Sequence, residues 1–138
     1  MAGEINATNI VIENGTGTIV GQMEATLTYN GTPIEIGNKS NGDNVTLLDG
    51  ELAGKQLQWA GTLVYNTDLQ AQKVLNDAIN GTMDTYTVTY PSSGATDESF
   101  TALMMPNGRA DSHPQGDKLS SAITFLSSGV ITHVPYAA

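Results

Sequence analysis

The 138-residue sequence predicts one domain of antiparallel β-strands with a single α-helix. Three observations support this fold class. Asn-Gly and Asp-Gly dipeptides, which favour positive φ and close β-hairpins, recur along the chain. The runs between them alternate apolar and polar residues, as strands with one buried face do. One window instead has the apolar period of a helix. The dipeptides stand at Asn14-Gly15, Asn30-Gly31, Asn41-Gly42, Asp49-Gly50, Asn80-Gly81 and Asn107-Gly108.

The alternation places the strands in chain order. We expect strands at residues 7–13, 17–20, 23–30, 33–36, 55–65, 85–90, 98–105 and 118–126. The clearest alternation is in 55–65, where Leu57 and Trp59 share one face and Gln56 and Gln58 share the other. Trp59 is therefore expected in the core rather than on a sugar-stacking surface. Other expected core residues are Phe100, Met104, Ile123 and Phe125.

The helix is expected over residues 68–80. Thr67 is the expected N-cap, with Gln70 completing a capping box, and Asn80-Gly81 supplies a left-handed stop. One apolar face follows helical spacing and should pack on a sheet. Its members are Ala71, Val74, Leu75, Ala78 and Ile79.

Two stretches are expected to be loops. Residues 37–54 are polar and glycine-rich but contain the apolar residues Val45, Leu47, Leu48 and Leu52. These residues need a burial partner, either in this domain or in another subunit. Residues 106–117 are rich in turn-forming residues. Long loops within a compact domain are uncommon and are usually functional or disordered.

The charge of the chain limits its partners. Fourteen Asp and Glu residues against five Lys and Arg give a formal net charge of −9. Tight binding of nucleic acid depends on many Lys and Arg contacts to phosphate, so this function is not expected of the chain. The chain has no cysteine, which excludes disulfides and thiolate metal sites. The first residues lack a signal peptide and no apolar run is long enough for a membrane anchor, so synthesis in the cytoplasm is expected.

No arrangement of residues indicates an enzyme or a cofactor. His113 and His133 stand apart, without a second histidine at metal-binding spacing. Asp97 and Glu98 are neighbours on a strand and point to opposite faces, which does not suit shared acid–base chemistry. We therefore expect no catalytic residues, no metal site and no cofactor.

The polar strand faces carry Thr, Gln and Ser in place of the usual Lys and Glu. Two readings remain open: the β-propensity of Thr alone, or a face that lines a wet space and must not adhere to what passes.

Residues 21–81 resemble the tail tube (major tail) proteins of long-tailed bacteriophages. Gly21 starts a G-Q-x-x-A-T-L strand, and Pro33 to Gly42 reads P-I-E-I-x-N-K-S-N-G. A loop with Leu47-Leu48-Asp49-Gly50 then leads to a strand around Trp59. The helix with Leu75 ends at Asn80-Gly81. The final third of the chain departs from the commoner pattern of that family.

This resemblance implies a fold of two packed antiparallel sheets, a β-sandwich or half-barrel, flanked by one helix. It implies hexameric rings that stack into a virion tail tube, an acidic and polar conduit through which DNA passes without specific binding. Tape measure and tail terminator proteins are then expected partners. The loop at 37–54 would reach the neighbouring ring through Asn38, Lys39, Val45, Leu47, Leu48 and Leu52. The expected lumen-facing residues are Glu24, Thr26, Thr28, Gln56, Gln58, Thr85 and Thr87.

Two alternatives share the same β architecture. One is a monomeric binding module, such as a carbohydrate-binding or adhesin-like β-sandwich, in which a saccharide would contact Trp59. The other is the inner-tube protein of a contractile injection system.

Overall fold

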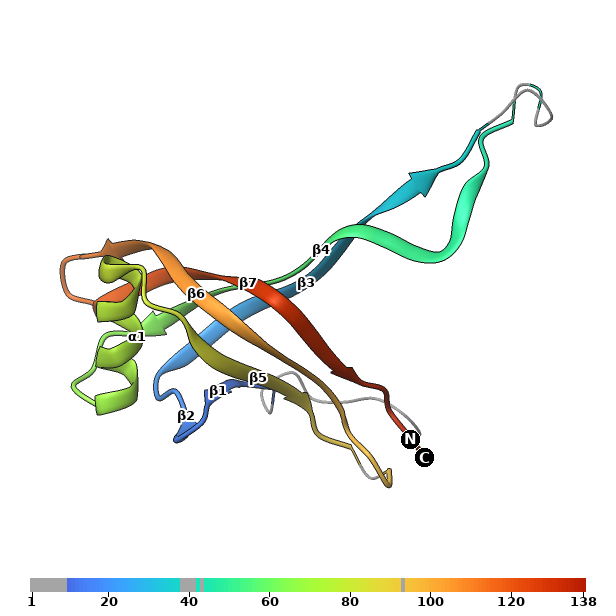
Figure 1. Ribbon diagram of the computed structural model, residues 1–138. Coiled ribbons are helices and arrows are strands. Elements are labelled where there is room, and N and C mark those ends of the chain that lie inside the picture. The colour runs from blue at the N-terminus through green and yellow to red at the C-terminus, as the bar shows by residue number, and fades with distance from the viewer. Residues whose placement is uncertain (1–9, 38–41, 43, 93) are drawn as a thin grey trace.

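The computed structural model describes residues 10–37, 42, 44–92 and 94–138. It contains one helix and one antiparallel sheet of seven strands (Figure 1). The elements are β1 (Ile12–Asn14), β2 (Gly17–Thr18), β3 (Gln22–Glu35), β4 (Leu47–Val64), α1 (Leu69–Asn80), β5 (Asp84–Tyr90), β6 (Glu98–Ser112) and β7 (Ser120–Val134). Their order across the sheet is β2-β1-β5-β6-β7-β4-β3. The predicted mainly β fold with a single flanking helix is confirmed.

The strands form one curled sheet, where two packed sheets were expected. The side chain of Gln22, at the start of the edge strand β3, reaches β1 near the opposite edge. Its amide nitrogen donates to the carbonyl of Ile12 at 2.6 Å, and its carbonyl accepts from the Ile12 amide at 2.8 Å. The sheet is therefore bent into a half-barrel. It remains one sheet because β6 pairs with β5 on one side and with β7 on the other.

The core fills the inside of the half-barrel. Trp59 is only 3% exposed, and its ring meets Phe125 edge to face at a centroid distance of 5.2 Å. Phe125 makes a second edge-to-face contact with Tyr86 at 4.7 Å. Met104 and Ile123 are buried as predicted, and Phe100 packs against the core while partly exposed. Trp59 is thus a core residue, so it offers no surface for a saccharide.

Helix α1 covers one end of the half-barrel and packs against β6 (Figure 1). The predicted N-cap at Thr67 is wrong. Asp68 has the extended backbone of an N-cap and its carboxylate accepts from the amide of Gln70 at 3.1 Å. A carboxylate at this position also interacts favourably with the helix dipole. The left-handed stop at Gly81 is confirmed, with φ of 70°.

The predicted apolar face of α1 is only partly buried. Ala71, Val74 and Leu75 lie in the core, whereas Ile79 is 68% exposed.

Several of the predicted turns and loops are instead strand, including Asp49-Gly50, which lies inside β4. Asn30-Gly31 lies inside β3, and Asn107-Gly108 lies inside β6 at a shift in register. Gly31 allows the side chain of Leu52 to approach closely, since a Cβ there would lie 2.8 Å from Leu52 Cβ. The expected loop at 106–117 is strand as far as Ser112. The Asn14-Gly15 hairpin between β1 and β2 is confirmed.

Strands β3 and β4 continue beyond the sheet as a two-stranded projection, here called the arm, which comprises residues 30–37 and 44–56. Figure 1 shows the arm standing away from the rest of the molecule. The expected loop at 37–54 is therefore β4 from Leu47 onward, paired as Glu35 with Leu47 and Pro33 with Leu52. Gly50 and Gly54 have positive φ at shifts in this pairing, so glycine occupies both irregular positions.

Candidate assembly surfaces

The polar side chains opposite the core form one continuous surface, here called the outer face. The outer face is continuous from one strand to the next, because residues that are directly paired on neighbouring strands point to the same side of the sheet. Thr26 pairs with Ala60 and Thr28 with Gln58, while Trp59 between them is buried. On the other side of the sheet, Thr87 pairs with Thr101, and their hydroxyl oxygens lie 3.1 Å apart.

The structure brings most residues predicted to face a lumen onto this one face. Six of them share it: Thr26, Thr28, Gln56, Gln58, Thr85 and Thr87. Glu24 stands at its margin, on the outermost strand β3, next to a shift in register between Gln22 and Ala25. The sequence placed these residues on separate strands, and the strand order is what unites them.

Residues of β6 and β7 in the middle of the outer face were missed. They include Thr101 and Leu103 of β6, and Ala122, Thr124 and Leu126 of β7. The period-two alternation of 120–126 was a sufficient signal for the β7 members, since Ser121, Ile123 and Phe125 are the buried partners of that alternation.

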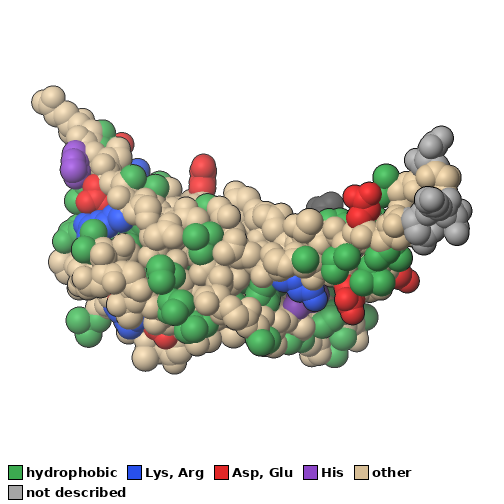
Figure 2. Space-filling view, turned by 45° about the horizontal axis from the view of Figure 1, so that its top comes forward, with side chains coloured by type: hydrophobic (Ala, Val, Ile, Leu, Met, Phe, Trp, Pro, Cys, Tyr) green, Lys and Arg blue, Asp and Glu red, His purple; other side chains and the backbone are tan. Residues whose placement is uncertain are grey.

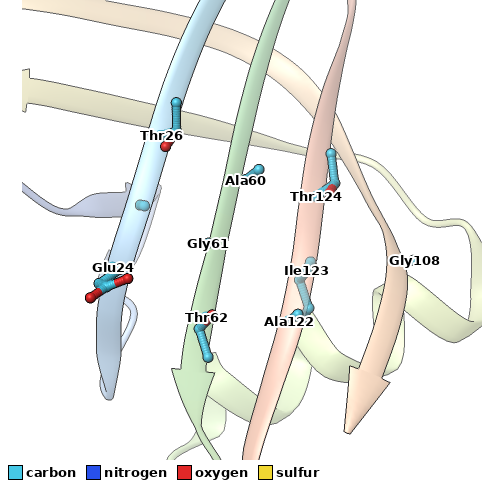
Figure 3. A pocket seen from close by; sticks show the side chains of 10 residues that line it. Glu24, Thr26, Ala60, Gly61, Thr62, Gly108, Ala122, Ile123 and Thr124 are labelled. Carbon is cyan, nitrogen blue, oxygen red and sulfur yellow. The ribbon is translucent and has the colours of Figure 1, made fainter.

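A shallow groove of about 590 Å³ crosses the outer face over β3, β4, β7 and β6. Figure 3 shows that its walls are small side chains, including Thr26, Ala60, Thr62 and Thr124. Glu24 is the only carboxylate among the residues that line it. The groove therefore offers hydroxyl and methyl groups, and it lacks the Lys and Arg groups that would hold phosphate.

The remaining described carboxylates lie away from this groove. They are Glu13 of β1, Glu35, Asp49 and Glu51 of the arm, Asp68, Asp77 and Asp84 around α1, Asp97, Glu98 and Asp111 towards the ends of β6, and Asp117. In Figure 2 most charged side chains gather towards the two ends of the molecule, over a largely neutral middle. The acidity of the chain is thus concentrated outside the small-residue groove.

The arm exposes the apolar residues that the sequence singled out. The exposed fractions are 70% for Val45, 51% for Leu47, 37% for Leu48 and 40% for Leu52. Apolar side chains on a projecting two-stranded ribbon have little to bury against in the same molecule. Asn38 and Lys39, predicted as contacts with a neighbouring ring, lie outside the described residues.

Two margins of the outer face have unpaired strand edges within the described residues. β3 pairs with β4 alone, so its other edge is open. β5 accompanies β6 only as far as Met104, and from Met105 to Ser112 β6 pairs with β7 alone. Open edges of this length favour pairing with another chain.

Ionic contacts connect α1 to the sheet. Lys73 lies 2.7 Å from the carboxylate of Asp77 and 3.1 Å from that of Asp84 at the start of β5. The hydrogen bond to Asp77, with Asp84 assisting, raises the pKa of Lys73. Nearby, burial raises the pKa of Tyr86 to about 12, and its hydroxyl has no hydrogen-bond partner among the described residues. The Lys73–Asp84 pair thus joins the helix to the first residue of β5, whereas the Lys73–Asp77 pair lies within the helix.

Two further polar contacts lie at opposite ends of β6. Arg109 donates to both carboxylate oxygens of Asp111 at 3.1 Å, which together with Ser121 lowers the pKa of Asp111. At the other end His133 lies 2.7 Å from Glu98. Across the described parts of the chain, no three His, Asp or Glu side chains are placed to hold a metal ion. No described helix is long and apolar enough to cross a membrane.

Comparison with known proteins finds similarity only at the level of structure. No family model matches the chain, and neither does any curated protein sequence. A chain from the tail of an empty gene transfer agent particle with C6 symmetry is 16% identical, with a TM-score of 0.79 over 96% of this chain and 100% of that one. A chain from the native virion of such a particle is 15% identical with the same TM-score and coverage.

Contractile systems give a more distant likeness. A chain from the sheath–tube complex of an extracellular contractile injection system is 12% identical, with a TM-score of 0.65 over 97% of this chain and 95% of that one. The likeness covers nearly the whole chain in each case, including the final third. It confirms the predicted tail-tube-like fold.

Proposed function

We propose that this chain is a structural subunit whose copies form hexameric rings, and that these rings stack into a virion tail tube through which DNA passes. The observation that carries the proposal is the whole-length fold match to a chain from a particle tail with C6 symmetry. A fold match alone does not transfer function, so the surfaces of this chain supply the rest of the support.

The outer face is suited to line a lumen. It joins Thr, Ser, Ala and Gln side chains over five strands, and its central groove carries a single carboxylate, Glu24. A surface without Lys or Arg does not neutralise phosphate, so DNA would slide past it without specific binding.

The open edges of the outer face are suited to close a ring. In the order β3-β4-β7-β6 every neighbouring pair is antiparallel. An open β3 edge set beside the open Met105–Ser112 edge of another copy would continue the same antiparallel alternation. Such a contact joins two different surfaces, and it closes into a ring when the rotation between copies permits.

The arm is suited to connect one ring to the next. It projects from the body and exposes Val45, Leu47, Leu48 and Leu52, which gain a burial partner only in an assembly. Tape measure and tail terminator proteins would complete such a tail as partners. The subunit itself would have no enzymatic role and no cofactor, and its place would be the virion, after synthesis in the host cytoplasm.

An inner tube of a contractile injection system is a second candidate, favoured by the match to a chain from a sheath–tube complex. The monomeric carbohydrate-binding alternative has lost its main support, because Trp59 is buried in the core.

Negative-stain electron microscopy of the purified protein over a range of concentrations tests the proposal. We expect rings and tubes from the full chain. A matched variant replaces residues 33–52 with Asn-Gly, which closes the hairpin at the Thr32–Ala53 pair and removes most of the arm. This variant is expected to give rings that do not stack. A strict monomer at the highest concentration, for both proteins, would contradict the proposal.

A further inference from the structure

A second hollow lies inside the half-barrel, between β3 and β5, and is here called the seam hollow. Its volume is about 650 Å³, which is in the range of sites that enclose a small ligand or several side chains. Apart from Glu24, its lining is apolar, and it includes Ile10, Met23, Leu27, Trp59, Val88 and Tyr90. An apolar hollow of this size, left unfilled by the described residues, calls for an apolar occupant.

The seam hollow begins where Gln22 stops bridging the two sides of the half-barrel. The Gln22 side chain bonds to Ile12 and also donates to the carbonyl of Ile19 at 2.8 Å, which holds β3 against β1. From Met23 onward β3 diverges from β1 and β5 and the hollow opens. Met23 is 45% exposed at this opening, and Glu24 stands beside it.

The arm carries a patch of matching character. Leu47, Leu48 and Leu52 lie together with Lys55 along a concave stretch of the arm, which Asp49 and Glu51 of β4 and Tyr29 and Pro33 of β3 also line. The other cations of the described chain have carboxylate partners: Lys73, Arg109 and Lys118. Among the described residues Lys55 has none, so it remains available for a carboxylate elsewhere.

We propose that the seam hollow of one copy receives the arm leucines of a second copy, with Lys55 of the arm set against Glu24 at the opening. The partner is a second copy because the arm leads away from its own body, so its leucines cannot enter their own hollow (Figure 1). Apolar side chains would fill an apolar site, and Lys55 and Glu24, which have no ionic partner among the described residues, are opposite in sign. The inference rests on the proposed function, because a tube is what brings one copy's arm to another copy's body.

Cross-linking tests this contact cleanly, because the chain has no cysteine of its own. The test protein carries Met23→Cys and Leu48→Cys, is assembled into tubes, and is treated with a short bis-maleimide. The control carries Leu48→Cys with Leu69→Cys, which places the second thiol on α1, where Leu69 is 82% exposed. Each single variant is treated in parallel to count links between identical positions.

We expect a ladder of linked subunits from the Met23–Leu48 protein and none above the single-variant level from the Leu48–Leu69 protein. Intact tubes that give a ladder only with Leu69, or with neither protein, would overturn the seam contact and leave the tube function standing. If the protein without substitutions forms no particles, both the seam contact and the tube function are overturned.

Charge reversal gives a second readout. Lys55→Glu is expected to raise the protein concentration needed for tube growth about tenfold, because it places two carboxylates together. Adding Glu24→Lys should restore growth, and the effect should weaken at high salt. Lys118→Glu is the matched control and should leave growth unchanged. A double variant that grows no better than Lys55→Glu would count against the contact.

Discussion

The indole ring of Trp59 lies over the backbone of Gly61, two residues further along β4. A Cβ placed on Gly61 would meet the ring, with Trp59 Cζ3 at 2.7 Å and Ala25 Cβ at 3.0 Å. Both residues point into the half-barrel, as successive odd positions of the strand do. Gly61 therefore leaves the space that the largest core side chain needs.

Gly61→Ala is expected to destabilise the fold by about 1–3 kcal/mol, because the added methyl group overpacks the core. Urea unfolding followed by Trp59 fluorescence measures this change. Gly15→Ala is the matched control: a Cβ at Gly15 meets no atom within 4 Å, so little loss is expected. Equal stability of the two variants would contradict the packing role of Gly61.

Gln22→Ala should loosen the end of the half-barrel, because it removes the hydrogen bonds to Ile12 and Ile19. A loss of about 1–3 kcal/mol is expected, since the Ile12 amide would lose its partner and the Ile12 carbonyl would keep only the long bond from the Ile19 amide at 3.4 Å. Hydrogen exchange at the Ile12 amide should accelerate more than exchange in β7. Gln58→Ala, on the outer face, is the control. Unchanged protection of Ile12 would show that the Gln22 bridge is dispensable.

Lys73→Met should weaken the attachment of α1, because Asp77 is only 8% exposed and would lose its cation. A cost of about 1–3 kcal/mol is expected from leaving a largely buried carboxylate unpaired. Lys118→Met, which removes an exposed pair at 3.7 Å, should cost less than about 0.5 kcal/mol. Thermal unfolding of both variants provides the comparison. A larger loss of stability for Lys118→Met than for Lys73→Met would contradict the stabilising role of the Lys73 ion pairs.

The raised pKa of Tyr86 predicts that the fold loses stability in strong alkali. Burial raises its pKa from 10.0 to about 12, so the folded state keeps the proton that the unfolded state releases. The contribution of the protonated Tyr86 phenol to the free energy of unfolding is complete below pH 10. It is lost as the pH rises from 10 to 12, by an amount on the order of 2–3 kcal/mol. Lys73, whose pKa is also raised, adds a loss of the same sign above its ordinary value of 10.5.

Tyr86→Phe should remove the part of this alkaline dependence that comes from the phenol. At neutral pH the variant should be as stable as the parent or more stable, because the buried hydroxyl has no hydrogen-bond partner in the described part of the chain. Urea unfolding at pH 7, 10 and 11 gives both results. A large loss at pH 7 would instead indicate a hydrogen bond to the Tyr86 hydroxyl.

Thr124→Lys tests the outer face as a lumen. Tubes should still form, because Thr124 lies in the middle of that face, away from both open edges. Six added cations per ring should make the tube retain DNA, and the retention should fall steeply with salt. Gln115→Lys, in the loop between β6 and β7, is the control with the same charge change. Equal DNA retention by both variants would argue against a lumen at Thr124.

Local chemistry made much of the fold predictable from the sequence. The β1–β2 hairpin, the strands around Trp59 and Val88, and the left-handed end of α1 each depend on residues close together in the chain. The polar character of the outer face was predicted for the same reason, because strict alternation fixes which side chains share a side, whereas its central groove is less acidic than the conduit that was expected. Its continuity depends on strand order, which pairs segments far apart in the sequence.

The errors came from glycines whose role depends on a neighbouring strand. Asn30-Gly31 and Asn107-Gly108 have the composition of turns, yet Gly31 makes room for Leu52 and Gly108 sits at a shift in register. Nothing in a local window distinguishes these uses from a hairpin turn. The same ambiguity made the stretch from Leu47 to Gly54 read as loop. Its apolar residues were expected to bury against either this domain or another subunit, and in the structure they lie exposed on the arm.

Strands β3 and β4 run from the sheet into the arm without a break in the chain. Their mutual hydrogen bonds, and those of β4 with β7, lie across the strand direction. Tension applied to the arm along its length would therefore act on many of these bonds together, in shear, and would not peel them apart one at a time. A filament whose subunits contact one another through such arms would therefore resist stretching along the arms better than it would resist a force that separates a single strand edge.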